Sequence, residues 1–186
     1  MIFTRRAQEN KLLNIIQTNC LYASDVDVSI YVGYYHNNIA FIELGINGSQ
    51  LEQWAMIKSV QNKFPGYSFE PNLNLHKDLN EEIINMINNS NQDNINIPIV
   101  HLIGTPFQIK VWNTLAKISR GETRTYAQIA EMIGSPKSVR AVGSAIEKNN
   151  HAVYIPCHRV VPKAGGVGQY KWGSDLKQNL LEIENA

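Results

Sequence analysis

The feature that most constrains this chain is a series of helix caps in its second half. Thr105-Pro106-Phe107-Gln108 combines an N-cap residue, a proline at the first helical position and a glutamine at the third. Thr125-Tyr126-Ala127-Gln128 repeats the pairing of a capping threonine with a glutamine. Gly134 is a natural helix stop, and Ser135-Pro136 can restart a helix at once. The pattern predicts three short helices, the first of which ends near Arg120-Gly121.

The apolar residues of these segments recur at helical spacing. Each helix has its own stripe, formed by Phe107, Val111 and Leu115, by Ile129, Ala130 and Ile133, and by Val139, Val142 and Ile146. Two short helices joined by a Gly-Ser-Pro turn indicate a helix-turn-helix, whose second helix would present Lys137 and Arg140. Since this geometry also occurs in proteins that never touch DNA, the pattern alone leaves DNA binding open.

The first half has patterns of both strands and helices, so the fold class that we predict is α+β. Residues 28–35 and 39–44 are rich in β-formers around a His-Asn-Asn turn, which is typical of a hairpin. A helix is predicted within residues 1–20, where Leu12, Leu13, Ile15 and Ile16 follow basic residues. A second is predicted to begin at the Ser49–Glu52 capping box and to end near Phe64-Pro65-Gly66, and a third to begin at Asp78. The Asn-rich residues 88–98 read as a linker or loop. No constellation in this half carries chemistry, which favours a supporting role.

Composition narrows the possible classes of function. Residues 1–101 hold 6 Lys/Arg against 10 Asp/Glu, whereas residues 102–186 hold 11 against 6, so the second half suits a polyanionic partner. No apolar run is long enough to span a membrane, and no signal peptide is visible. Two cysteines make no disulfide framework, which favours a cytoplasmic location, and the five scattered histidines give no argument for a metal site.

The candidate reactive group is Cys157, which directly precedes His158 in Ile155-Pro156-Cys157-His158-Arg159-Val160-Val161. A thiolate is a strong nucleophile, and a neighbouring histidine can help to generate it. A lone Cys-His pair is nevertheless more often structural, because free cysteine is among the most buried residue types. A glycine-rich loop, residues 165–170, and a final helix over residues 175–184 follow.

These motifs together resemble the O6-alkylguanine-DNA alkyltransferases (methylated-DNA–protein-cysteine methyltransferases). The resemblance covers residues 102–186 closely and the first half only in layout. It rests on ordered motifs, namely Gly104–Gln108 with Val111-Trp112, Gly121-Glu122, Thr125-Tyr126, Gly134-x-Pro136-Lys137, Arg140–Gly143, Pro156–Val161, and Gly168-x-Tyr170 with Lys177 to Glu184. The run Tyr170–Gly173 is most similar to the C-terminal domain of the bacterial Ada adaptive-response protein.

The resemblance implies a ribonuclease-H-like α/β domain over residues 1–98 and a helical winged-helix-type DNA-binding domain over residues 99–186. It implies a monomeric, single-turnover methylated-DNA–[protein]-cysteine S-methyltransferase. Such a protein flips O6-alkylguanine, and also O4-alkylthymine, out of double-stranded DNA and moves the alkyl group irreversibly to Cys157. Since water does not cleave the thioether product, we expect stoichiometric repair with no cofactor and no metal.

The resemblance also assigns roles to single residues. In the catalytic group, Cys157 is the acceptor, His158 a base acting through water, Glu184 its orienting partner, Asn149 a brace, and Tyr126 a proton donor to the leaving base. Arg140 fills the gap left by the flipped nucleotide, and the other DNA-binding candidates are Lys137, Tyr126, Thr125, Ser144 and Ala141. The base pocket would be lined by Tyr126, Val167, Gly168, Tyr170 and Lys171.

Three positions depart from the family pattern. Asn150 stands where the family usually has proline, which predicts a looser turn. Lys171 stands where some members have a serine whose backbone contacts the base, which predicts an altered pocket preference. Pro162, close behind the motif, has no expected effect.

Two other classes of function remain as alternatives. One is a non-enzymatic lesion sensor or helix-turn-helix regulator, which would need no polarised thiol. The other is a cysteine hydrolase, which would require an oxyanion hole and a base free to serve two steps.

Overall fold

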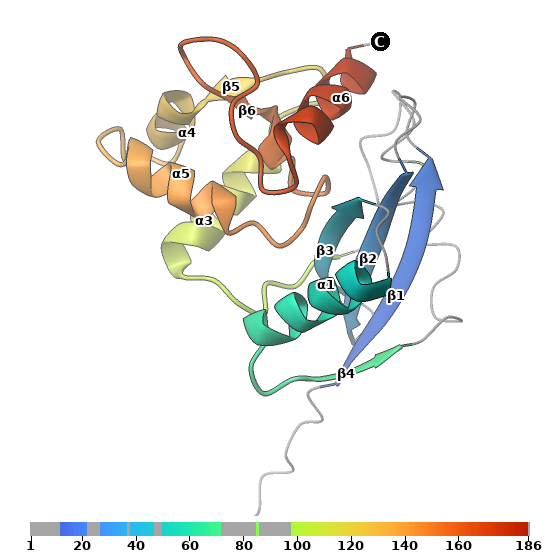
Figure 1. Cartoon of the computed structure of the whole chain (residues 1–186). Coiled ribbons are helices and arrows are strands. Elements are labelled where there is room, and N and C mark those ends of the chain that lie inside the picture. Colours follow the sequence, from blue (N-terminus) through green and yellow to red (C-terminus); the bar gives the residue numbers. More distant parts are fainter. Residues whose placement is uncertain are drawn as a thin grey trace, which may run out of the picture.

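The computed structural model describes residues 12–21, 27–36, 38–46, 50–71, 85 and 98–185, and it has a mixed α/β fold in which a sheet lies beside a helical half (Figure 1). The elements of the first half are β1 (Leu12–Leu21), β2 (Asp27–Tyr35), β3 (Asn38–Ile46), α1 (Gln50–Lys63) and β4 (Ser68–Pro71). Those of the second half are α3 (Pro106–Leu115), β5 (Arg124–Thr125), α4 (Tyr126–Met132), α5 (Val139–Glu147), the 3₁₀ helix η1 (Cys157–Arg159), β6 (Val160–Val161) and α6 (Ser174–Glu184).

The sheet of the first half has the strand order β3-β2-β1-β4. The predicted hairpin is confirmed, since β2 and β3 pair antiparallel across the turn at His36. Their register shifts between Gly33 and Tyr34, and a Cβ at Gly33 would collide with the Phe41 ring. The α1 helix ends at Lys63, directly before the predicted Phe64-Pro65-Gly66 stop.

The prediction of a helix within residues 1–20 is wrong for the part that the structure describes. Leu12–Leu21 is instead the strand β1, which pairs antiparallel with β2 and parallel with β4. A short run such as Leu-Leu-Asn-Ile-Ile fits both periods, and strand partners on both sides decide the outcome. The Ser49 cap, most of the predicted helix after Asp78 and the linker up to residue 97 lie outside the described residues.

The two faces of the sheet are buried by different parts of the chain. On one face, Tyr31 and Phe41 pack against Val60 and Phe64 at the C-terminal end of α1. The other face, which includes Ile30 and Ile42, packs against the second half, where its partners are Ala152, Val153, Leu176 and Leu180. The sheet is therefore a layer between α1 and the helical half.

The helical half begins its helices with the predicted caps. Thr105 and Thr125 each accept a hydrogen bond from the backbone N–H of the glutamine three residues later, and both capping boxes are complete. Gly134 has φ +71°, which confirms it as the residue that stops α4. The α3, α4 and α5 helices enclose a core around Trp112, whose Nε1 donates to the Ala145 carbonyl at 2.8 Å.

Two predicted helix boundaries are wrong. The α3 helix ends at Leu115 rather than near Arg120, because tighter turns over the next residues replace the α-helical pattern. The α5 helix begins at Val139 rather than at Ser135-Pro136, since Ser135–Ser138 forms a separate turn closed by the Ser138 N–H and the Ser135 carbonyl. Lys137 consequently lies in the turn of the helix-turn-helix and not on its second helix.

Backbone hydrogen bonds join the two halves along β3, which is an edge strand of the sheet. The Ile42 N–H donates to the Asn150 carbonyl at 2.7 Å, and the Ala152 N–H donates to the Ile42 carbonyl at 2.9 Å. Ile39 is bonded in the same way to Pro98 and Val100. These bonds fix the turn that precedes Cys157 against the sheet. None of the helices in the described part of the chain is long and apolar enough to cross a membrane.

Candidate functional site

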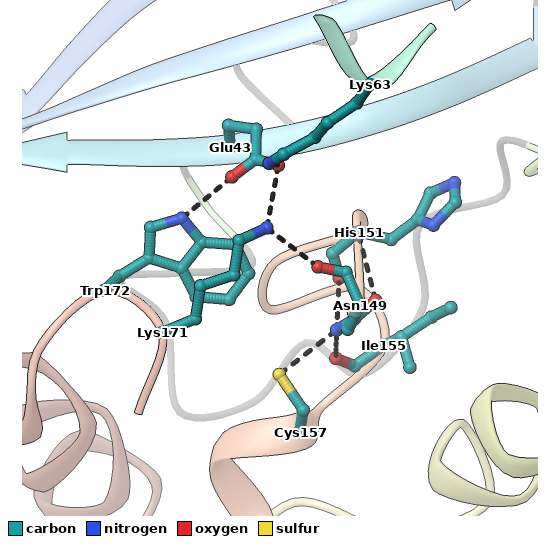
Figure 2. Close-up of polar contacts among 8 residues, drawn as sticks. All are labelled: Glu43, Lys63, Asn149, His151, Ile155, Cys157, Lys171 and Trp172. Carbon is teal, nitrogen blue, oxygen red and sulfur yellow. Dashed lines mark hydrogen bonds and ion pairs between the residues drawn. The ribbon is translucent and has the colours of Figure 1, made fainter. Parts of the chain in front are cut away.

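Cys157 lies at the start of η1 in the interior of the helical half. Its exposed fraction is 4%, and its sulfur is in the free thiol form. The Asn149 Nδ2 atom donates to Cys157 Sγ at 3.1 Å (Figure 2). The burial of Cys157 leaves open both a structural and a reactive role, so its neighbours decide between them.

Asn149 holds the chain segment that leads to the cysteine. The buried Nδ2 atom also donates to the Ile155 carbonyl at 2.9 Å, and the Oδ1 atom accepts from the His151 N–H at 2.9 Å. One side chain thus bonds both ends of the turn and the sulfur. Asn150 is buried, and its carbonyl is the group that pairs with β3.

The thiol is protonated in its resting state. Burial raises the pKa of Cys157, and this effect exceeds the lowering by the Asn149 hydrogen bond and by the Lys171 and Lys177 ammonium groups. A reaction at the sulfur therefore needs a base to remove the proton.

His158 and Glu184 form a buried pair beside the cysteine. His158 Nε2 lies 2.8 Å from Glu184 Oε1, and the histidine side chain is fully buried. Burial raises the pKa of Glu184, but hydrogen bonds from His158 and Arg159 outweigh this and bring it to about 2. Burial lowers the pKa of His158 despite the hydrogen bond with Glu184. The pair is therefore a neutral imidazole that donates from Nε2 to an ionised carboxylate, which leaves Nδ1 as the basic atom.

Two residues near this pair had no role assigned from the sequence. Arg159 donates from Nε and Nη2 to the Glu184 carboxylate at 2.8–3.1 Å and from Nη1 to the Ile118 carbonyl. Lys177 is 1% exposed and donates to the Val160 carbonyl at 2.6 Å, and burial lowers its pKa to about 8 despite the nearby Cys157. Both lie in segments that the sequence singled out, Pro156–Val161 and Lys177 to Glu184, but no local spacing named their partners.

A pocket of about 430 Å³ opens onto Cys157. Its wall combines residues of α4, α5 and the loop before α6, namely Tyr126, Arg140, Gly143, Ser144, Ile146, Glu147, Cys157, Gln169, Tyr170 and Lys171. Burial, together with the nearby Cys157, raises the pKa of Tyr126, so its phenol keeps its proton. The pocket is within the usual size range of sites for small organic groups.

The structure brings most of the predicted site residues together. Arg140, Ser144 and Tyr126 line the pocket, while Lys137 and Ala141 are exposed beside it on the helix-turn-helix. The Thr125 hydroxyl is engaged in its cap with Gln128.

Different residues of the glycine-rich loop line two separate pockets. Tyr170 and Lys171 line the pocket at Cys157, whereas Val167 lines a separate, open hollow with Gln178 and Leu181. Gly168 belongs to neither lining. It has φ +73°, and a Cβ there would lie 2.6 Å from Pro162 Cγ, so Pro162 limits the path of the loop.

No three His, Cys, Asp or Glu side chains gather into a possible metal site within the described ranges. The acid-base pair His158–Glu184 beside Cys157 suits a proton transfer away from a buried thiol.

Comparisons with known proteins agree with this geometry. Residues 106–186 match the model of the family described as "6-O-methylguanine DNA methyltransferase, DNA binding domain". The matched region contains Cys157, the His158–Glu184 pair and all the residues that line the pocket.

Curated relatives match about half of the chain or more. A methylated-DNA–protein-cysteine methyltransferase of Kluyveromyces lactis is 50% identical over 91 residues, which cover 49% of this chain and 48% of the relative. The Escherichia coli bifunctional transcriptional activator/DNA repair enzyme Ada is 39% identical over 130 residues, which cover 69% of this chain and 36% of that protein. The chain thus spans about half or less of the length of these curated relatives.

Solved structures match nearly the whole chain. The Mycobacterium tuberculosis OGT in complex with DNA superimposes with a TM-score of 0.72 at 23% identity and covers 92% of both chains. An O6-methylguanine-DNA methyltransferase from Pyrococcus kodakaraensis gives a TM-score of 0.72 at 24% identity, covering 94% of this chain and 99% of its own. At this level of identity the likeness shows that the fold is shared.

Proposed function

We propose that the protein repairs DNA by transferring an alkyl group from O6-alkylguanine to Cys157, since residues 106–186 match the model of the 6-O-methylguanine DNA methyltransferase family. The observation that carries the proposal is the free, buried Cys157 thiol at the wall of a pocket that also contains Tyr126 and Arg140. The substrate class includes O4-alkylthymine, which presents the same alkyl ether.

The first step is extrusion of the damaged base into the pocket. A base inside a duplex cannot present its alkyl group to a buried thiol, and extrusion costs a few kcal/mol, least for a mispaired base. The exposed Arg140 at the pocket mouth is long enough to occupy the vacated stack. Lys137, Ala141, Ser144 and Thr125 flank it and would contact the DNA backbone.

The second step is alkyl transfer. His158 Nδ1 takes the thiol proton through a water molecule while Nε2 stays bonded to Glu184, whose carboxylate stabilises the imidazolium. The thiolate attacks the sp³ alkyl carbon, the new C–S bond forms as the C–O6 bond breaks, and the electron pair passes to the guanine. The Tyr126 phenol then protonates the leaving base. The thioether is stable in water, so each molecule acts once.

The proposed protein has two domains, which follow one another along the chain. Residues 1–98 form a small ribonuclease-H-like domain, supported by the strand order β3-β2-β1-β4 with α1 between β3 and β4. Residues 99–186 form a winged-helix-type domain, supported by the α3, α4 and α5 cluster and the small β5–β6 pair.

Mass spectrometry of the protein after incubation with a duplex carrying one O6-methylguanine tests the proposal. We expect one added methyl group on the Cys157 peptide, saturating at one per protein. Cys157→Ala should bind the same duplex and gain no methyl group, whereas Cys20→Ala should react like the wild type. Binding of the duplex by folded wild-type protein without any adduct would overturn the proposal and favour a lesion sensor.

A further inference from the structure

Glu43 is a buried carboxylate of the sheet that binds residues of the pocket loop, although it lies outside residues 106–186, the region matched by the family model. Glu43 lies on β3, and it is 2% exposed although its strand neighbours are apolar. Its Oε1 atom accepts from Lys63 Nζ at 2.7 Å and from Lys171 Nζ at 2.8 Å, and its Oε2 atom accepts from Trp172 Nε1 at 3.0 Å (Figure 2). One side chain therefore bonds α1 and two consecutive residues of the pocket loop.

Lys171 extends this contact to the nucleophile. Its Nζ atom also donates to the Asn149 carbonyl at 3.0 Å, and the Asn149 side chain donates to Cys157 Sγ. Figure 2 shows these groups in sequence, from the carboxylate on the strand to the sulfur on η1. Lys171 lines the same pocket as Cys157, so its position also sets the shape of the pocket wall.

We propose that Glu43 is a positioning residue for alkyl transfer, which holds Lys171 and Trp172 so that the pocket wall and the Asn149 brace stay aligned with Cys157. This role rests on the proposed function of the site. The first half of the chain then contributes to reactivity through Glu43, in addition to its support of the fold.

The side chain of Glu43 is not required to join the two halves. Backbone hydrogen bonds between Ile42 and the turn Asn150–Ala152 already hold that turn on β3. Lys63 binds the same Glu43 oxygen from α1, whereas it is Lys171 that donates to the Asn149 carbonyl. Lys63 is therefore a matched control, because its removal breaks an ion pair of Glu43 and leaves the link to the site intact.

Charge gives Glu43 a second effect on the site. Burial lowers the pKa of Lys171, and Glu43 raises it again, whereas Lys63 lowers it further. Lys171 also faces Cys157 and His151 of the turn. Glu43 thus favours the protonated form of Lys171, and that form in turn favours the thiolate of Cys157.

The test compares Glu43→Gln with Lys63→Gln in single-turnover transfer from a saturating O6-methylguanine duplex. We expect Glu43→Gln to slow transfer about tenfold, and Lys63→Gln to stay within about twofold of the wild type. Duplex affinity should hold in both variants, because neither residue lines the pocket. The alkaline limb of the pH–rate profile should move to lower pH in Glu43→Gln and to higher pH in Lys63→Gln.

A further variant shows whether the effect passes through Lys171. Glu43→Gln combined with Lys171→Met should be no slower than Lys171→Met alone, because both changes break the same link. If Glu43→Gln does not fold, Lys171→Met breaks that link from the pocket side and should slow transfer similarly. Equal slowing and equal loss of thermal stability in Glu43→Gln and Lys63→Gln, or an unchanged rate in Glu43→Gln, would overturn the positioning role.

The two proposals fail in different ways. Wild-type protein that gains no methyl group refutes the transfer activity, and the positioning role is then read from alkylation by iodoacetamide. Peptide mass spectrometry separates Cys157 from Cys20, which serves as the internal reference. Slower labelling of Cys157 alone in Glu43→Gln supports the role, and equal labelling rejects it.

Discussion

Two buried carboxylates are connected to the Cys157 site through other side chains, and they come from different parts of the chain. Glu184 binds His158 and Arg159, all within the helical half, and in the proposed mechanism it orients the base that serves the thiol. Glu43 stands on the sheet and binds Lys171 and Trp172, 128 and 129 residues further along the chain. In our proposals the Glu184 cluster serves proton transfer, whereas the Glu43 cluster positions the pocket wall.

The clusters also differ in their contact with solvent. The side chains of His158 and Arg159 are 0% and 9% exposed, whereas those of Lys63 and Lys171 are 29% and 22% exposed. Removing one member of a fully buried ion pair leaves a charge without compensation, while a partly exposed lysine can turn toward water. The Glu184 cluster should therefore matter more for stability, and the Glu43 cluster more for the rate.

The largest effect is expected for Glu184→Ala. It leaves Arg159 buried without its partner, and the free energy of unfolding should fall by about 3–5 kcal/mol. Urea denaturation monitored by tryptophan fluorescence measures the change. Glu182→Ala, an exposed position on the same helix, should change stability by less than about 0.5 kcal/mol. A loss from Glu43→Ala as large as that from Glu184→Ala would remove the contrast between the clusters.

The second largest effect is expected in the pH dependence of stability, which should differ between His151, near Lys171, and Glu184. Burial, together with the charges of His101 and Lys171, lowers the pKa of His151 from 6.5 to about 3, so stability falls as the pH drops below 6.5. Glu184, with a lowered pKa, loses its contribution only as the pH falls from about 4.5 toward 2. His151→Gln should remove roughly 4 kcal/mol of the loss above pH 3, measured as urea midpoints against pH. His36→Gln, at an exposed turn, should leave this limb unchanged.

The smallest effect concerns the two capping threonines. Thr105 follows the segment bonded to β3, and Thr125 belongs to β5, which pairs with β6 directly after η1. Replacing either by alanine should lower the free energy of unfolding by about 1 kcal/mol. Fluorescence anisotropy with labelled duplex should show weaker binding only for Thr125→Ala, because that cap precedes Tyr126. Equal loss of duplex affinity in both variants would contradict this distinction.

Local patterns predicted much of the helical half and one hairpin of the sheet. The caps at Thr105 and Thr125, the stop at Gly134 and the hairpin of β2 and β3 each depend on neighbouring residues, and the structure confirms them. The boundaries that failed depend on the tertiary structure. The chain beyond Leu115 turns so that the Ile118 carbonyl meets Arg159, and β1 is a strand because two other strands pair with it.

The candidate site divides in the same way. Cys157, His158 and Glu184 follow from a motif and its resemblance, and the structure places His158 against Glu184. Glu43 gave a visible signal, a charge between Ile42 and Leu44 in an apolar strand. Its partner Lys171 was predicted as a residue of the base pocket and as a departure from the family pattern, but not as a partner of Glu43, because no local spacing relates residues so far apart.

The pairing along β3 has a consequence for the fate of partly unfolded molecules. A strand at the border of a sheet presents free N–H and C=O groups that can template pairing with another chain. Here Ile39 and Ile42 of β3 are occupied by Pro98, Val100, Asn150 and Ala152 of the same chain. Detachment of the helical half would uncover this border and promote aggregation, so the half that carries Cys157 also shields the sheet from pairing with other copies of the chain.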